Sequence, residues 1–309
     1  MKTSIALIAL FVVAMNTNAA EMNAFAKPDP ALQQVVDDVA AGALKEFAAK
    51  KLASNQLAIT LVNLRDPQQP RMASFRGDAP IYPASVVKLF YLAAAHRWME
   101  DGKLRDTAEL RRAMRDMIVE SSNDATHYVL DALTATTSGP ELPEAAMKIW
   151  GDKRNAVNRY FASLGYTKIN ANQKPWCEGP YGRDRIWVGQ DYANRNTLTT
   201  DATARLLTEI ALRQCISVQR SEEMMKLLSR DRAEKVSDTD SQTHGFTGIG
   251  LPSDAKLWSK AGWTSTTRHD AAYVELADGR KFVLVTFTTS HANEREILAF
   301  VARQVVARL

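Results

Sequence analysis

A serine and a lysine three residues apart form the first pattern in this sequence that could carry out chemistry. Ser85-Val86-Val87-Lys88 follows Pro83 and opens an apolar stretch with helical spacing that runs to Trp98. Residues three apart on a helix lie on the same face, so the lysine nitrogen can reach the serine oxygen. Burial favours the neutral form of a lysine, which can then accept the proton of a serine nucleophile. We therefore predict covalent catalysis by Ser85, with Lys88 as its basic partner.

The Ser-x-x-Lys spacing alone is common, and the chain contains a second copy. Ser253-Asp254-Ala255-Lys256 lies in a polar stretch before a predicted strand, where no helix would hold the two side chains together. Two rarer motifs favour the first copy: Ser121-Ser122-Asn123 is the only Ser-x-Asn, and Lys260-Ala261-Gly262 is the only Lys-x-Gly. We predict that these three motifs share one catalytic site.

Other common catalytic signatures are missing from the sequence. It contains no Gly-x-Ser-x-Gly, no His-Glu-x-x-His, no Cys-x-x-Cys and no complete glycine-rich phosphate loop. The histidines show no metal-ligand spacing; they are His96, His127, His244, His269 and His291. We therefore expect neither a metal nor a cofactor.

The elements that must position these motifs follow from the spacing of apolar residues. Helical spacing predicts an opening helix over 31–47, a second from 85 to 98 and a closing helix over 294–306. Helical patterns such as 110–133 and 199–212 dominate 107–227, with one long irregular segment at 170–196. Alternating apolar residues and Pro- or Gly-containing turns predict five strands, at 56–63, 71–75, 256–263, 270–276 and 281–288.

This order of elements predicts an α+β fold. We expect one five-stranded antiparallel sheet, built from both ends of the chain and flanked by helices, with an all-helical part inserted in the middle. The sheet part would cover about 27–92 and 247–309, and the helical part about 93–246. A cleft is expected where the two parts meet.

The N-terminus has the pattern of a signal peptide. A basic start at Lys2 precedes an apolar run over 4–15, which is too short to span a bilayer, and small residues follow. We predict a signal peptide over 1–20, with cleavage as late as 26, and one catalytic domain over 27–309. The expected protein is secreted or periplasmic, without a membrane anchor, and a monomer.

Charge and cysteine content set two further expectations. The net charge of +4 falls to +3 once Lys2 is removed, which is too small and too evenly spread for nucleic-acid binding. Cys177 and Cys215 would lie in a compartment where disulfides persist, so they form either one bridge or two buried free thiols.

Together the three motifs resemble the class A serine β-lactamase family, within the wider group of penicillin-recognising serine hydrolases. The resemblance extends over essentially the whole mature chain. Further segments that are similar to the family are Tyr82 to Leu89, Gly250-Leu251-Pro252, Thr266-Thr267 and Asp270-Ala271-Ala272. The resemblance implies a β-lactamase/transpeptidase-like fold and a bacterial source.

The resemblance also implies a role for each motif residue. Ser85 attacks an amide carbonyl carbon, and Lys88 accepts its proton directly or through water. Ser121 relays a proton to the leaving nitrogen, and Asn123 holds Lys88 and a substrate amide. Lys260 attracts a substrate carboxylate. The strand after it, through Gly262 and Trp263, contacts the substrate, and the backbone N–H groups of Ser85 and Trp263 form the oxyanion hole.

Three departures from the family pattern concern substrate choice and deacylation. Ala261 replaces the family's Thr or Ser, so Arg268 is a candidate for binding the substrate carboxylate, with an ordinary exposed arginine as the alternative. Ser122 replaces the family's Asp. The Glu-x-x-Leu-Asn segment that activates the deacylating water in class A enzymes is absent. Glu178, within 170–196, is the best-placed carboxylate for that step, with an ordinary loop carboxylate as the alternative.

The leading functional hypothesis is hydrolysis of the β-lactam amide bond through an acyl-serine. One alternative is a related hydrolase that acts on D-alanyl peptides or on other amides or esters, which Ala261 and the divergent loop favour. A second alternative is a penicillin sensor that stays acylated. A degenerate fold used only for interaction is disfavoured by the intact motifs.

Overall fold

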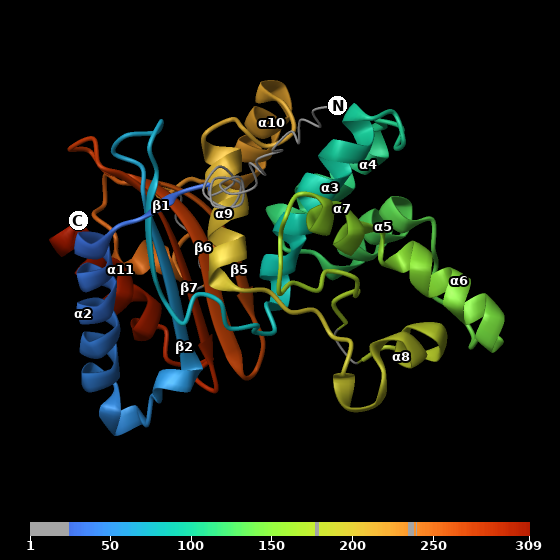
Figure 1. The fold of residues 1–309 in the computed structure, drawn as a ribbon, viewed down its shortest axis with the longest axis horizontal. Helices are drawn as coiled ribbons and strands as arrows, with labels where there is room; N and C mark the ends of the chain where they lie inside the picture. The colour runs from blue at the N-terminus through green and yellow to red at the C-terminus, as the bar shows by residue number, and fades with distance from the viewer. Residues whose placement is uncertain (1–24, 177–178, 234–237, 239) are drawn as a thin grey trace, which may run out of the picture.

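The predicted strands pair into one sheet, which stands at the centre of the molecule (Figure 1). The computed structural model describes residues 25–176, 179–233, 238 and 240–309. Within these residues the strands are β1 Lys27–Pro28, β2 Leu57–Asn63, β3 Arg71–Phe75, β4 Ser229–Arg230, β5 Lys256–Trp263, β6 Thr267–Glu275 and β7 Lys281–Thr289. The sheet order is β1-β3-β2-β7-β6-β5-β4.

The prediction of a five-stranded antiparallel sheet needs one correction. The five predicted strands are present, but two strands of two residues each, β1 and β4, extend the sheet at its edges to seven strands in the described part of the chain. β1 pairs parallel to β3, so the sheet is mixed. Two residues are too few to show the alternation on which strand prediction depends.

Helices pack on both faces of the sheet and form a separate lobe beside it. The α-helices in the described residues are α2 Pro30–Glu46, α3 Lys88–Glu100, α4 Ala108–Ile118, α5 Asn123–Thr134, α6 Glu144–Arg154, α7 Ala156–Ser163, α8 Gly182–Val188, α9 Thr200–Ala211, α10 Val218–Leu228 and α11 Glu296–Arg308. Short 3₁₀ helices are η1 Ala48–Lys50, η2 Ser54–Gln56, η3 Ala84–Val87, η4 Gln190–Tyr192 and η5 Thr247–Gly250.

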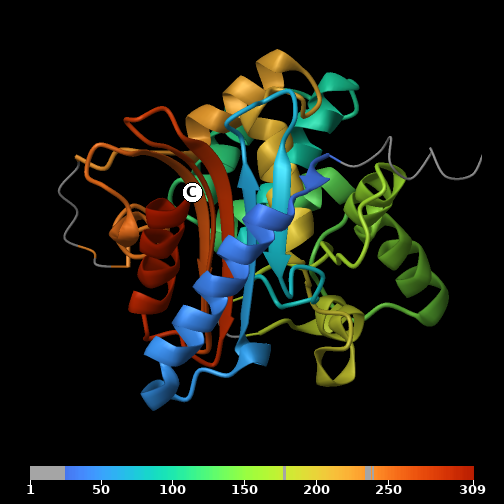
Figure 2. The same cartoon turned by 60° about the vertical axis from the view of Figure 1, so that its left-hand side comes forward.

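The sheet packs against helices on both of its faces, through one apolar layer on each face. The first and last helices, α2 and α11, lie side by side on one face (Figure 2), where their valine and leucine stripes pack against β2, β5, β6 and β7. On the other face α9 packs against β2, β6 and β7. It belongs to the segment 93–246 that the sequence assigns to the helical part, yet it covers the sheet. Thr60 of β2 donates a hydrogen bond of 2.6 Å to Asp201 Oδ1 of α9.

The lobe contains α3 to α8, and α3 joins it to the sheet (Figure 1). Residues on every side of α3 are buried, Lys88 and His96 among them, so other elements pack around most of the helix. The sequence predicts one helical pattern over 110–133, but the chain forms two helices here. Ser122 accepts a hydrogen bond of 3.1 Å from Ala125 N and so caps α5, while Ser121 before it has a φ of +54°. The Ser-x-Asn motif therefore lies on the turn that leads into α5, with Asn123 as the first residue of that helix.

Several predictions fall on residues outside the described part of the chain. These are the signal peptide over 1–20, Cys177 and Glu178. Cys215 is a buried free thiol, and burial raises its pKa to about 12. Among the described residues, no helix combines the length and the apolar character needed to cross a membrane.

Candidate active site

The nucleophile candidate Ser85 lies in a tight turn where the chain passes from the sheet into α3. Ala84 has a φ of +46°, a conformation that costs an alanine about 1–2 kcal/mol. The residues around Ser85 in η3 are buried, while Ser85 itself is half-buried. The turn thus uses backbone strain to present one hydroxyl at the surface of a packed core.

Lys88 begins α3, and its side chain is fully buried. Its Nζ donates hydrogen bonds of 2.6 Å to Ser121 O, 3.3 Å to Ser121 Oγ and 2.9 Å to Asn123 Oδ1. The left-handed turn at Ser121 aims both oxygens of that residue at the lysine. The structure therefore brings the first two motifs into direct contact.

Lys260 on β5 reaches the same serine from the opposite side. Its Nζ donates to Ser121 Oγ at 3.0 Å, so the hydroxyl lies between two lysines. Lys260 is fully buried, and desolvation, with Lys88 and Arg230 nearby, lowers its pKa well below the usual range. A hydroxyl held by two lysine nitrogens is suited to passing a proton.

The glycine of the third motif allows β5 to approach the nucleophile turn. A Cβ at Gly262 would lie 2.7 Å from Pro83 O and 2.8 Å from Ser85 N, so only glycine fits here without a backbone shift. The strand after it continues to Trp263, which is 39% exposed, with its ring 5.6 Å from that of Phe246. The predicted oxyanion-hole residues Ser85 and Trp263 therefore flank this close contact.

His269 on β6 holds the chain that enters the nucleophile turn. Thr288 N donates to His269 Nδ1 at 3.1 Å, so Nε2 carries the proton and donates to Tyr82 O at 2.9 Å. Burial lowers the pKa of this histidine to about 4. The sequence gives no signal for this role, because a lone histidine in a strand carries no motif.

Arg230 and Asp270 place further charge beneath the site. Arg230 Nη2 donates to Ser259 O at 2.6 Å, beside Lys260, and burial lowers its pKa to about 10. Asp270 pairs with Ala261 across β5 and β6, and burial raises its pKa to about 6. A buried cluster with more cations than carboxylates favours negative charge developing at Ser85.

Gln242, which contacts Lys260, is a second residue that sequence reasoning missed. Its Oε1 accepts from Lys260 Nζ at 2.7 Å and from Ala261 N at 3.1 Å. Its Nε2 donates to the carbonyl oxygens of Ile118 and Val119, both at 2.8 Å. A glutamine in a polar loop belongs to no motif, and only the folded chain brings it to β5.

Arg268, the other candidate for binding a substrate carboxylate, is only 3% exposed. Its guanidinium donates to Ala292 O at 2.6 Å, to Gly245 O at 3.0 Å and to Asp240 Oδ1 at 2.8 Å. The alternative of an ordinary exposed arginine is wrong, because this side chain is buried in a network that ties β6 to two loops.

The segment 170–196 approaches the site with a well-ordered stem, although Glu178 itself lies outside the described residues. Asn196 Oδ1 accepts from Asn172 N and Gln173 N, both at 3.0 Å. Tyr91 of α3 donates to Gln173 O at 2.7 Å. The segment is not wholly irregular, since α8 forms within it. The stem contacts α3 at Gln173 and α5 farther on, where His127 Nε2 lies 2.6 Å from Pro175 O and its ring lies 6.2 Å from that of Trp176.

Two hollows flank the motif residues, and together we call them the cleft. One, of about 430 Å³, is lined by Ser121, Gln242 and Trp263, among others. The other, of about 400 Å³, lies between Tyr82, the loop at Trp176 and the turn at Thr264–Thr266. In the described part of the chain, no group of three or more His, Cys, Asp or Glu side chains is arranged to hold a metal ion.

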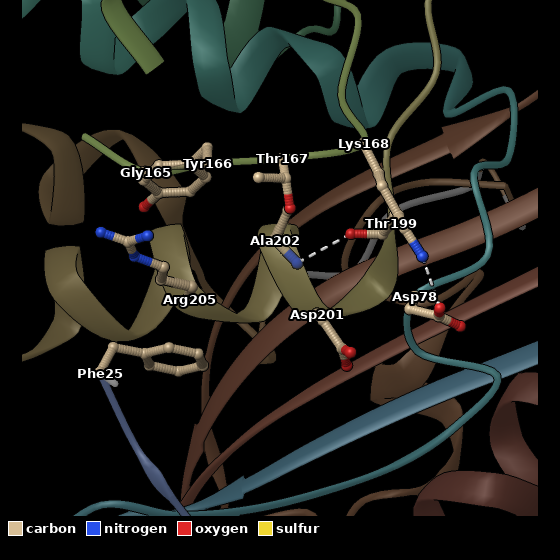
Figure 3. Close-up of a pocket in the computed structure, with 10 residues that line it drawn as sticks. All are labelled: Phe25, Asp78, Gly165, Tyr166, Thr167, Lys168, Thr199, Asp201, Ala202 and Arg205. Atoms are coloured by element: carbon tan, nitrogen blue, oxygen red, sulfur yellow. Dashed lines mark hydrogen bonds and ion pairs between the residues drawn. The ribbon is translucent and has the colours of Figure 1, made fainter. Parts of the chain in front are cut away.

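A third cavity, of about 330 Å³, lies apart from the motif residues (Figure 3). It is bordered by α9 and by the chain at Tyr166 and Lys168. Its charged groups have partners: Lys168 Nζ lies 2.6 Å from Asp78 Oδ2, the Arg205 guanidinium stacks 4.0 Å from the Tyr166 ring centre, and Asp201 accepts from Thr60. These contacts stabilise the fold. Because the cavity lies apart from the motif residues, those residues remain the candidate catalytic site.

The fold and the linked motifs define a serine β-lactamase-like hydrolase. The sequence profile of the β-lactamase enzyme family matches residues 40–309, so the chain belongs to that family. No curated protein sequence matches the chain significantly.

Solved structures agree on the fold at low sequence identity. PBP-A, as a point mutant in an acyl-enzyme complex with penicillin G, is 15% identical with a TM-score of 0.63, covering 91% of this chain and 97% of that one. The β-lactamase of Sphaerobacter thermophilus is 18% identical with a TM-score of 0.62, covering 88% and 97%. A variant of the reconstructed Gram-negative ancestor of class A β-lactamases is 19% identical with a TM-score of 0.63, covering 87% and 97%.

Proposed function

We propose that the chain hydrolyses β-lactams through an acyl-enzyme at Ser85. The observation that carries this proposal is the Ser121 hydroxyl, which lies 3.3 Å from Lys88 Nζ and 3.0 Å from Lys260 Nζ. Ser85 Oγ bonds to the lactam carbonyl carbon, the C–N bond breaks, and the proton from Ser85 reaches the lactam nitrogen through Lys88 and Ser121. Water then releases the penicilloate. We propose that this takes place outside the cytoplasm, after signal-peptide cleavage.

We propose Glu178 as the base that activates the deacylating water. What supports it is its place in the chain, because Trp176 and Gly179, before and after this part of the chain, line the same hollow as Tyr82. A Glu178→Gln variant should acylate normally and accumulate the adduct. If the variant turns over substrate at the wild-type rate, another group activates the water.

Turnover and intact mass, measured together with a penicillin and a cephalosporin, test the proposal. Rapid substrate loss with a short-lived adduct supports a β-lactamase. A long-lived adduct favours the second candidate, a peptidase-like acyl hydrolase, or the third, a penicillin sensor. The methyl group of Ala261, where class A enzymes carry a hydroxyl, is the specific observation in favour of the second candidate. If neither lactam reacts, lactam recognition is excluded.

A further inference from the structure

Gln242 links the two parts of the molecule at the edge of the cleft. It is only 8% exposed, and all its amide atoms are used: Oε1 accepts from β5, and Nε2 donates to the end of α4 and to Val119. Because Ala261 N can only donate and the two carbonyl oxygens can only accept, the orientation of the amide is fixed.

The Gln242 amide also accepts one of the hydrogen bonds that the Lys260 ammonium donates. An ammonium has three N–H groups. Those of Lys260 donate to Ser121 Oγ at 3.0 Å, to Gln242 Oε1 at 2.7 Å and to Ala261 O at 2.7 Å. A substrate carboxylate could bind Lys260 only by displacing one of these buried bonds. The usual carboxylate-attracting cation of such a site is therefore already committed within the protein.

The other expected donors are committed as well. Ala261 has no hydroxyl, and its methyl group is fully buried in the apolar layer beneath α2 and α11. The buried guanidinium of Arg268 donates to Asp240, which Arg295 also contacts at 2.9 Å. Neither residue offers the cleft an N–H or O–H group.

Charge in the adjoining hollow disfavours an anionic ligand. Among the described residues that line it, two are arginines, Arg115 and Arg230, and four are acidic. The acidic ones are Glu120, Asp231, Asp238 and Asp240. Arg115 pairs with Glu120 at 3.2 Å, so the lining of this hollow adds no excess of positive charge to that of the buried Lys88 and Lys260.

We propose, on the basis of the function proposed above, that Gln242 removes the preference of this cleft for acyl donors whose leaving group carries a carboxylate. Neutral esters and amides, including lactams whose acid is masked, are then substrates alongside the free acids. Ser85 Oγ bonds to the acyl carbon, the C–O or C–N bond breaks, and the serine proton passes to the leaving oxygen or nitrogen. Water then releases the acid and frees Ser85.

Penicillin G and its methyl ester provide a direct test, because they differ only at this carboxylate. The purified protein is incubated with each, and the second-order rate constant of acylation is measured by intact mass. We expect the two rate constants to agree within tenfold. A larger preference for the acid overturns the inference and leaves the proposed function standing. If neither compound acylates Ser85, the proposed function fails, and this inference fails with it.

Two substitutions of Gln242 test whether this residue sets the ratio of the acylation rate constants for the acid and the ester. Gln242→Met frees one Lys260 N–H, so the preference for the acid over the ester should rise at least fivefold. Gln242→Glu adds a negative charge and should shift the preference at least threefold toward the ester. The matched control is Gln173→Met, which removes a buried amide from the loop stem and should leave the ratio unchanged.

An unchanged ratio in both Gln242 variants overturns the assignment, as does an equal shift in the control. The ratio is measured on the acylated fraction of each preparation, so a lower yield of folded variant does not alter the result.

Discussion

Two buried lysines on opposite sides of the cleft are held in different ways. Lys174, on the loop stem, donates to the Asp131 carboxylate at 2.7 Å and to Ser138 Oγ at 2.8 Å. Lys260 is more deeply buried, and its three hydrogen-bond acceptors are all neutral. Burying a charge without a carboxylate contact is costly, so the fold tolerates it only where the charge is used. We therefore expect Lys174 to serve the structure and Lys260 to serve the proposed reaction.

The surroundings of the two lysines differ in the same way. The loop stem is built from neutral amides, Asn172, Gln173 and Asn196, with paired ions behind them. The wall at Ser121 gathers Lys88, Lys260 and Arg230 around one hydroxyl. Neutral amides can fix a backbone without biasing charge, whereas clustered cations bias proton transfer and the charge that develops on a substrate.

Matched substitutions of the two lysines should give opposite results. Lys260→Met should lower the acylation rate constant about 100-fold or more, because Ser121 loses one of its two cationic partners. Lys174→Met should lower the free energy of unfolding by about 2 kcal/mol, because Asp131 loses one of its two cationic partners and keeps Arg154 at 3.3 Å. Acylation by the folded Lys174 variant should stay within threefold of wild type. Penicillin acylation kinetics and urea unfolding measure the two effects. The comparison would be refuted if Lys174→Met slowed acylation while Lys260→Met lowered only the free energy of unfolding.

Gly262→Ala should damage the Ser121 side of the cleft and also lower the free energy of unfolding. The added Cβ would meet Ser85 N at 2.8 Å, and backbone atoms cannot move aside as a flexible side chain can. We expect acylation to slow by about 10- to 100-fold, because the oxyanion-hole donor is displaced. Gly279→Ala, on the distant β6–β7 turn, is the control. Equal acylation by both variants would show that β5 does not position Ser85.

Tyr91→Phe should damage the loop side instead. The hydroxyl donates to Gln173 O and accepts from Gln173 N at 3.2 Å, and both groups are buried. Their loss should cost about 1–2 kcal/mol of unfolding free energy. Deacylation should slow more than acylation, because the stem leads to Glu178. A variant in which acylation slows more would contradict this division between the two sides.

The pH dependence of stability should report on His269. Its pKa of about 4 lies below the usual value near 6.5, so the unfolded chain binds its proton first as the pH falls. The stability that His269 contributes is therefore present above pH 6.5 and is lost progressively toward pH 4. His269→Gln should reduce the slope in this window by about 1.4 kcal/mol per pH unit.

Urea unfolding at several pH values measures this slope. His96, with a pKa also lowered to about 4, and Asp270, with a pKa raised to about 6, titrate in the same window. Both are present in wild type and variant, so the difference between the two isolates His269. Identical slopes would show that His269 is not held neutral in the fold.

The sequence predicts the residues that carry motifs and the elements with a clear period. Ser85, Lys88, Ser121 and Lys260 stand in short motifs, and the structure brings the last three into direct contact. The five longer strands and the closing helix also follow their apolar patterns. These features depend on local spacing, which a sequence shows directly.

The residues that sequence reasoning missed act through tertiary contacts. Gln242 and His269 reach the site from a loop and a neighbouring strand, and nothing near them in the sequence marks their partners. The pattern predicts helix at Ser121 because its flanks are helical and one left-handed residue leaves no periodic signal. The sequence makes Arg268 a candidate for binding a substrate carboxylate, because its ion-pair partner Asp240 is distant along the chain and no pattern marks the pair.

Peptide mapping of the protein after a brief pulse with penicillin G tests the central claim most directly. We predict one modified peptide that contains Ser85, with the added mass of intact penicillin, and no modification in the Ser85→Ala variant. The same peptide should be modified far more slowly in Lys260→Met. An adduct that persists in Ser85→Ala, or a wild-type protein that remains unmodified, would contradict acyl-enzyme formation at Ser85.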